Sequence, residues 1–101
     1  MPIHLIWGDD AAARDRAING LIETVVDPSW ASLNLSRLDG AEAGQAAQAL
    51  DEARTPPFAT GERLVLLQRS PFCNGCPTEL ADRFEAALTL IPDSSNLVLV
   101  N

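Results

Sequence analysis

The only two cysteines of the chain lie three positions apart, and their side chains are its most reactive. Cys73 and Cys76 flank Asn74-Gly75 ahead of a predicted helix. This spacing suits a redox dithiol, or half of a tetrahedral zinc site. A thioredoxin-like motif usually follows an early strand, however, and two thiolates supply only half of the ligands of a structural zinc ion. We therefore favour an unligated pair of loop cysteines, with zinc shared between two chains and a catalytic dithiol as the alternatives.

The turn Gly8-Asp9-Asp10 occupies the place of the phosphate-binding loop in an α/β domain. Such a loop is rich in glycine and presents the N–H groups of the next helix to an anion. A working loop also needs Gly-Lys-Ser/Thr at the start of that helix, and this chain has alanines there. The two carboxylates would also repel phosphates. We interpret Gly8, Asp9 and Asp10 as a degenerate nucleotide loop that caps a helix and binds no nucleotide.

An aromatic ring beside two prolines is the third candidate site. Phe58 follows Pro56 and Pro57, in a helix-terminal loop of the kind that usually carries polar residues at the surface. The prolines stiffen the segment, so an exposed ring there would lose little entropy on binding a partner. Alternatively, Phe58 folds back onto its own domain. The pattern alone does not separate the two interpretations.

The remaining polar side chains do not suggest catalysis. The carboxylates are scattered, without a Ser-His-Asp arrangement or an acid–base pair, so we predict no catalytic residue and no cofactor. His4 and Trp7 lie in a predicted strand and are interpreted as packing residues. Trp30 is interpreted as covering an edge of a sheet.

Four apolar runs and three stretches of helical periodicity define the predicted elements. The second run alternates apolar and polar residues, which favours the edge of a sheet, whereas the other three runs favour central strands. Strands are expected at His4–Trp7, Leu33–Ser36, Leu64–Leu67 and Leu97–Val100, and helices over Ile18–Val25, Ala43–Leu50 and Leu80–Ile91.

The resulting order β-α-β-α-β-α-β predicts a three-layer α/β domain. Helices between successive strands imply a parallel sheet with helices on both faces, as in P-loop NTPases. We expect residues 1–101 to form one domain. Because the chain stops directly after a buried strand, we also expect it to be a truncated piece of a longer protein.

Charge and hydropathy limit the partners. Seven basic residues against 14 acidic ones give a formal net charge of −7, which disfavours direct contact with a nucleic-acid backbone. No apolar run reaches the roughly 20 residues that span a bilayer, and the start of the chain lacks the features of a signal peptide. We therefore expect a cytoplasmic protein without membrane contact.

Two stretches of the sequence resemble one family. His4–Asp10 is similar to the start of bacterial delta subunits of the DNA polymerase III clamp loader. Ala53–Leu67, which contains Thr55, Phe58, Arg63 and Leu64, resembles a second segment of the same family, and this likeness is the stronger one. The order of elements agrees with the resemblance over essentially the whole chain.

The resemblance implies a function in DNA replication. It implies an N-terminal AAA+-like domain without an ATP site, and so an accessory, non-catalytic subunit of the polymerase holoenzyme. In the family, an apolar pair enters a pocket on the sliding clamp and helps to open it, and by position that pair is Pro57 and Phe58. Other loader subunits, which hydrolyse ATP, would bind through regions absent here, and DNA would be contacted only indirectly. Where this chain has Pro57, the family commonly has leucine or phenylalanine, so most of the apolar contact falls to Phe58.

Overall fold

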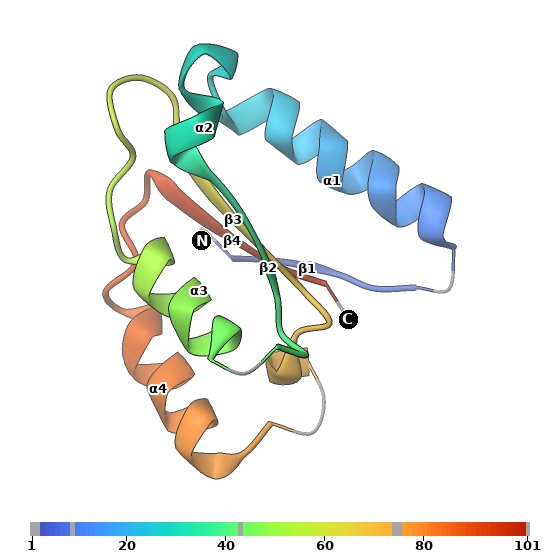
Figure 1. Cartoon of the computed structure of the whole chain (residues 1–101), viewed down its shortest axis with the longest axis vertical. Helices are drawn as coiled ribbons and strands as arrows, with labels where there is room; N and C mark the ends of the chain where they lie inside the picture. Colours follow the sequence, from blue (N-terminus) through green and yellow to red (C-terminus); the bar gives the residue numbers. More distant parts are fainter. Residues whose placement is uncertain (1–2, 9, 43, 74–75, 101) are drawn as a thin grey trace.

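Four short strands form one parallel sheet, drawn in Figure 1. This computed structural model describes residues 3–8, 10–42, 44–73 and 76–100, without the side chain of Cys73. The strands lie in the order β1-β4-β3-β2. They are β1 (Ile3–Ile6), β2 (Leu35–Asp39), β3 (Arg63–Gln68) and β4 (Ser95–Val100).

The sheet is covered by helices on both faces, which confirms the predicted three-layer α/β fold. Helices α3 (Gln45–Ala53) and α4 (Thr78–Leu88) pack on one face, and α1 (Ala11–Val25) packs on the other. The rest of the helical structure is short: α2 (Ala31–Asn34) and the 3-10 turns η1 (Pro28–Trp30) and η2 (Pro71–Cys73).

The two central strands supply both halves of the core. Successive side chains of a strand point to opposite faces of its sheet. On the face under α3 and α4 lie Val65, Leu67, Leu97 and Leu99, and on the face under α1 lie Leu64, Leu66, Val98 and Val100. This arrangement explains why β3 and β4 are apolar without alternation.

Two predictions about the strands are wrong. The first strand lies at an edge of the described sheet, because β1 pairs with β4 while β3 and β4 occupy the centre. The second strand begins at Leu35, because the preceding residues form α2 and place Asn34 in the protein interior. The alternation of Leu33–Ser36 therefore records a helix end followed by a strand.

Helix boundaries follow local chemistry. Asp10 is the N-cap of α1, where its side chain accepts a hydrogen bond from the Ala13 N–H at 3.1 Å. Helix α4 ends at Leu88, and Ile91 is buried against the core from beyond the helix. Ala43, expected at the start of the second long helix, lies outside the described residues.

Parallel strands give the sheet two chemically different ends. At the amino end, where strands begin, the segment before β3 meets α2. At the carboxyl end lie the turn after β1 and the residues that follow β2 and β3. Ligands of α/β domains usually bind at the carboxyl end.

Candidate functional site: the Phe58 loop at the amino end of the sheet

Phe58 presents its ring to solvent. The residue is 59% exposed, and it lies in the segment between α3 and β3, called here the Phe58 loop (residues 55–61). Its ring centroid is 5.7 Å from that of Trp30, with the rings tilted by 51°. Both interpretations of the sequence thus apply in part, because one side of the ring rests on Trp30 while more than half of the residue is exposed. Pro57, its neighbour, is half-buried.

The backbone of Phe58 is held by the side chain of one buried residue. Asn34, the last residue of α2, is 0% exposed. Its Nδ2 donates to the Phe58 carbonyl at 2.8 Å, and its Oδ1 accepts from the Phe58 N–H at 2.6 Å. One amide therefore satisfies both backbone groups of the exposed aromatic residue.

The first two residues of the loop are held by the strands beneath them. The Ser95 hydroxyl at the start of β4 donates to the Thr55 carbonyl at 3.0 Å. The Arg63 guanidinium at the start of β3 donates to the Pro56 carbonyl through Nε and Nη2, at 3.4 and 3.3 Å. Both side chains are buried, so each anchors the loop from within the domain.

The end of the loop, and Glu62 directly after it, are tied to residues at and just beyond the end of α1. The Thr60 hydroxyl donates to Asp27 Oδ2 at 2.7 Å, and the Glu62 N–H donates to the Val25 carbonyl at 2.8 Å. The Thr60 hydroxyl, followed by the N–H of Ser29, holds the pKa of the Asp27 carboxyl below its usual value. The loop is thus fixed at both of its ends and at Phe58.

The close approach of the loop to Asp27 depends on a glycine. Gly61 has a φ of +85°, a conformation that disfavours side chains. A Cβ at this position would lie 2.8 Å from the Asp27 backbone nitrogen. Backbone conformation and packing therefore both require glycine here.

At the carboxyl end, polar groups of the candidate nucleotide loop are hydrogen-bonded within the first turn of α1. The Asp10 carboxylate caps α1, and the Arg14 guanidinium donates to the Gly8 carbonyl. Trp7, just before this turn, is 70% exposed. Asp9, the third residue of the predicted degenerate loop, lies outside the described residues.

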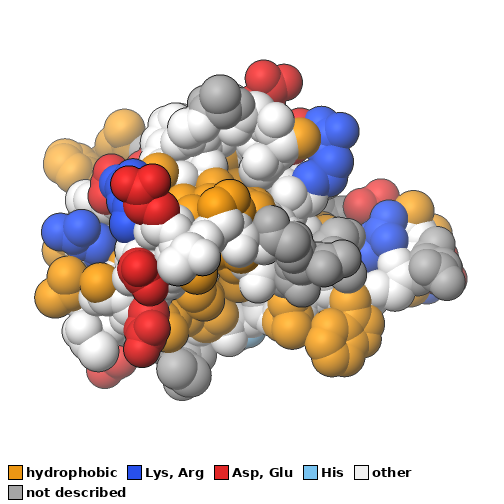
Figure 2. All heavy atoms as spheres, turned by 90° about the horizontal axis from the view of Figure 1, so that it is seen from below, with side chains coloured by type: hydrophobic (Ala, Val, Ile, Leu, Met, Phe, Trp, Pro, Cys, Tyr) orange, Lys and Arg blue, Asp and Glu red, His pale blue; other side chains and the backbone are white. Residues whose placement is uncertain are grey.

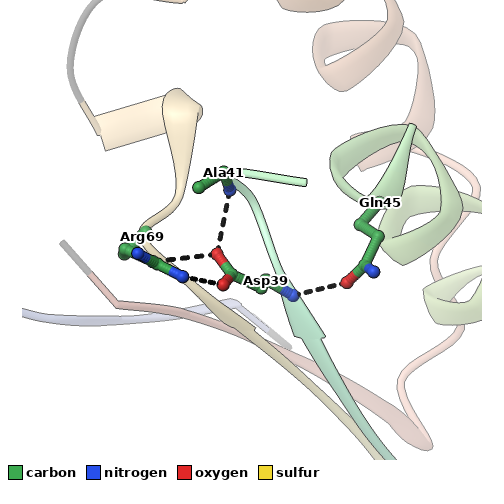
Figure 3. A network of polar contacts seen from close by, with 4 residues as sticks. All are labelled: Asp39, Ala41, Gln45 and Arg69. Carbon is green, nitrogen blue, oxygen red and sulfur yellow. Dashed lines mark hydrogen bonds and ion pairs between the residues drawn. The ribbon is translucent and has the colours of Figure 1, made fainter. Parts of the chain in front are cut away.

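The ends of β2 and β3 are joined by an ion pair, shown in Figure 3. The Asp39 carboxylate accepts from Arg69 Nε at 3.0 Å and from the Ala41 N–H at 2.9 Å, while the Gln45 side chain accepts from the Asp39 N–H at 2.7 Å. The Arg69 hydrogen bond, followed by the Ala41 N–H, lowers the pKa of Asp39. The Asp39 carboxylate and the Arg69 guanidinium are thus paired with each other at this end of the sheet.

The cysteines do not form a recognisable site in the described part of the chain. Cys76 is half-buried, and its thiol donates to the Pro77 carbonyl at 3.5 Å. No group of three metal-ligating side chains occurs among the described residues. Asn74, Gly75 and the Cys73 side chain lie outside them, so the prediction of an unligated pair stays a prediction.

On the face drawn in Figure 2, the surface charges do not gather as a site for DNA would require. On the face drawn in Figure 2, the arginine side chains lie in separate places with acidic side chains between them. A protein that neutralises phosphates presents a continuous basic patch or stripe. No described helix is long and apolar enough to cross a membrane.

Fold and surface together define an α/β domain with the architecture of a nucleotide-binding protein and an exposed aromatic residue, Phe58, at the amino end of its sheet. Comparison with known proteins gives the family. The family model for the DNA polymerase III delta subunit matches residues 4–101, and the chain therefore belongs to that family.

Comparison with solved structures supports the same fold. The structure is similar to that of the Bacillus subtilis DNA clamp loader delta protein, with a TM-score of 0.83 and 24% sequence identity. The match covers 99% of this chain and 31% of that chain, so the sequence spans less than a third of the protein it resembles. No curated protein matches the sequence.

Sequence reasoning missed the polar residues that hold the Phe58 loop. Asn34, Arg63 and Ser95 lie 24, 7 and 40 positions from their loop partners. Their signal was weak, since each is a single polar residue beside an apolar run. Asn34 offers the clearest hint, because it lies between two leucines of the predicted strand Leu33–Ser36.

Proposed function

We propose that this protein binds the sliding clamp of DNA polymerase III through Phe58, with Pro57 beside it, and helps to open the clamp during DNA replication. Membership of the delta subunit family supports the proposal. The observation that carries it is the geometry of Phe58, an exposed aromatic residue whose backbone is fixed by a buried amide. An anchor of this kind loses little entropy when it enters a pocket.

The proposed role is mechanical. Phe58 would enter an apolar pocket on the clamp, and docking there would favour the open form of a clamp interface through which DNA enters. ATP hydrolysis would belong to other subunits of the loader, which this protein would contact through parts of the subunit beyond these residues. DNA would be contacted only indirectly, and the work would take place in the cytoplasm.

The anchor is tested by titrating the cognate sliding clamp in a calorimeter with the wild type and with Phe58→Ala. Burying a phenylalanine side chain contributes about 1.5–3 kcal/mol, so Phe58→Ala should weaken clamp binding by about 10- to 100-fold. Phe58→Leu is the matched control, because it keeps most of the apolar area and should keep most of the affinity. Equal affinities for wild type and Phe58→Ala would show that Phe58 is not the anchor.

Clamp opening requires its own measurement. Clamps loaded on circular DNA should dissociate faster when the wild type is added in excess, and Phe58→Ala should not accelerate their release. Binding without any accelerated release would leave the clamp contact in place and contradict the opening role.

A further inference from the structure

Asn34 makes two hydrogen bonds to the backbone of Phe58, the residue on which the proposed function depends most. Its side-chain amide donates to the Phe58 carbonyl at 2.8 Å and accepts from the Phe58 N–H at 2.6 Å. An amide carries a donor and an acceptor side by side, so it can pair with both groups of one backbone residue. Asn34 itself is 0% exposed, which protects both bonds from water.

The neighbours of Phe58 cannot replace these bonds. Pro57 has no N–H to donate, and Ala59 has a φ of +61°, outside any regular element. Among the described residues, no other hydrogen bond reaches the Phe58 backbone. The ring is also weakly restrained, because Trp30 contacts it on one side while the residue is 59% exposed.

We propose that Asn34 is a positioning residue for clamp binding, which holds the Phe58 backbone so that the ring is presented in its binding orientation. This inference rests on the proposed function and adds to it a residue that need not touch the clamp. The two hydrogen bonds between Asn34 and the Phe58 backbone contribute little to the apolar core. They instead raise the fraction of molecules in which the Phe58 ring is in its binding orientation.

The size of the effect follows from that fraction. When only part of a population is competent to bind, the apparent dissociation constant rises in inverse proportion to the competent part. Asn34→Ala removes both bonds and should weaken clamp binding by about 3- to 30-fold. Asn34→Asp keeps the acceptor but places an oxygen against the Phe58 carbonyl, so it should weaken binding at least as much.

A double-mutant cycle separates positioning from general destabilisation. Clamp affinity is measured by NMR titration for wild type, Asn34→Ala, Phe58→Ala and the double variant, with folded fractions from circular dichroism. If Asn34 acts through the ring, the double variant should bind as Phe58→Ala does, within about twofold. The control Val100→Ala, which removes buried atoms at the far end of β4, should bind like wild type while it lowers stability.

Different outcomes of these titrations test the proposed function and the role of Asn34 separately. Wild-type affinity in Phe58→Ala overturns the proposed function itself. If Phe58→Ala loses affinity, the inference about Asn34 is overturned when Asn34→Ala binds the clamp like wild type. It is also overturned when the Asn34→Ala change weakens binding equally in the presence and absence of Phe58→Ala, or when Val100→Ala loses as much affinity as Asn34→Ala.

Hydrogen exchange tests the positioning without any variant, and so remains informative if Asn34→Ala fails to fold. In the wild type, the Phe58 N–H should exchange at least tenfold more slowly than an unstructured amide of the same sequence. Exchange at the unstructured rate would show that Asn34 does not hold the residue, and would overturn the inference.

Discussion

The two ends of the sheet differ in what their polar side chains contact. At the carboxyl end, where an α/β domain usually binds its ligand, Asp10 caps a helix and Arg69 pairs with Asp39. At the amino end, buried side chains hold a loop whose Phe58 is exposed. The polar side chains described at the first end cap a helix or pair with each other, whereas those at the second end hold a loop with an exposed aromatic residue.

This difference shows how little a fold says about function by itself. The order of strands and helices would suit a nucleotide-binding protein, but the lysine and hydroxyl that a phosphate loop needs are absent after Gly8. The loop at the other end required only a proline pair, an aromatic residue and a few buried hydrogen bonds. The following changes test the two ends against each other, from the largest expected effect to the smallest.

Gly61→Ala should be the most damaging single change in the Phe58 loop. The residue has a φ of +85°, and an added Cβ would lie 2.8 Å from the Asp27 nitrogen and 2.9 Å from its Cβ. Strain and contact together should lower the free energy of unfolding by about 2–3 kcal/mol, measured by urea denaturation. Clamp affinity should fall as well, because the loop cannot keep its place against Asp27.

Gly20→Ala is the matched control for that change. Gly20 lies within α1, and a Cβ there would meet nothing within 4 Å. Alanine is the better helix former, so stability should rise by about 0.5–1 kcal/mol and clamp affinity should not change. A Gly61→Ala protein as stable as the wild type would show that the loop is not tied to α1 as described.

Acid should loosen both ends. The folded-state pKa values of Asp27 and Asp39 lie below their usual values, through Thr60 and Arg69 respectively. Such carboxylates contribute stability that is fully present above the unfolded pKa, near pH 4, and is lost as the pH falls through the lower folded values.

The contribution of each end to this pH dependence can be separated. Urea midpoints measured from pH 6 down to pH 2 should fall less steeply in Thr60→Ala, which removes the hydrogen bond that lowers the pKa of Asp27 most. They should also fall less steeply in Arg69→Gln, which removes the hydrogen bond that lowers the pKa of Asp39 most. The Arg69 effect should shrink in salt, because that pair is exposed. A Thr60→Ala profile parallel to that of the wild type would argue against the Asp27 contact.

Nucleotide should have the smallest effect of all. Millimolar Mg-ATP should leave the melting temperature of the wild type unchanged, because a ligand that does not bind the native state cannot stabilise it. A rise in the melting temperature that depends on ATP concentration would show that the carboxyl end has kept a ligand site.

The order of elements was predictable because it depends on local patterns. The apolar runs Leu64–Leu67 and Leu97–Val100 predicted strands covered on both faces, and the stripe Ile18–Val25 predicted an amphipathic helix. The position of β1 at an edge was not predictable, because apolar content does not reveal how many neighbours a strand has.

The exposed residue of the candidate site could be predicted from the sequence, but the buried side chains that hold its loop could not. Pro57 and Phe58 stand out from their composition, since an aromatic residue directly after two prolines is unusual in a regular element. Asn34, Arg63 and Ser95 reach the loop only after the chain has folded, and each appears in the sequence as an isolated polar residue. Their roles follow from contacts between distant segments.

The central claim, that clamp binding belongs to the amino end of the sheet, is tested most directly by titrating the cognate clamp with Phe58→Ala and Trp7→Ala in parallel. Both changes remove a large exposed aromatic side chain, at opposite ends of the sheet. The account predicts that Phe58→Ala loses affinity by about 10- to 100-fold while Trp7→Ala binds as the wild type does. Loss of binding in Trp7→Ala with full affinity in Phe58→Ala would contradict it.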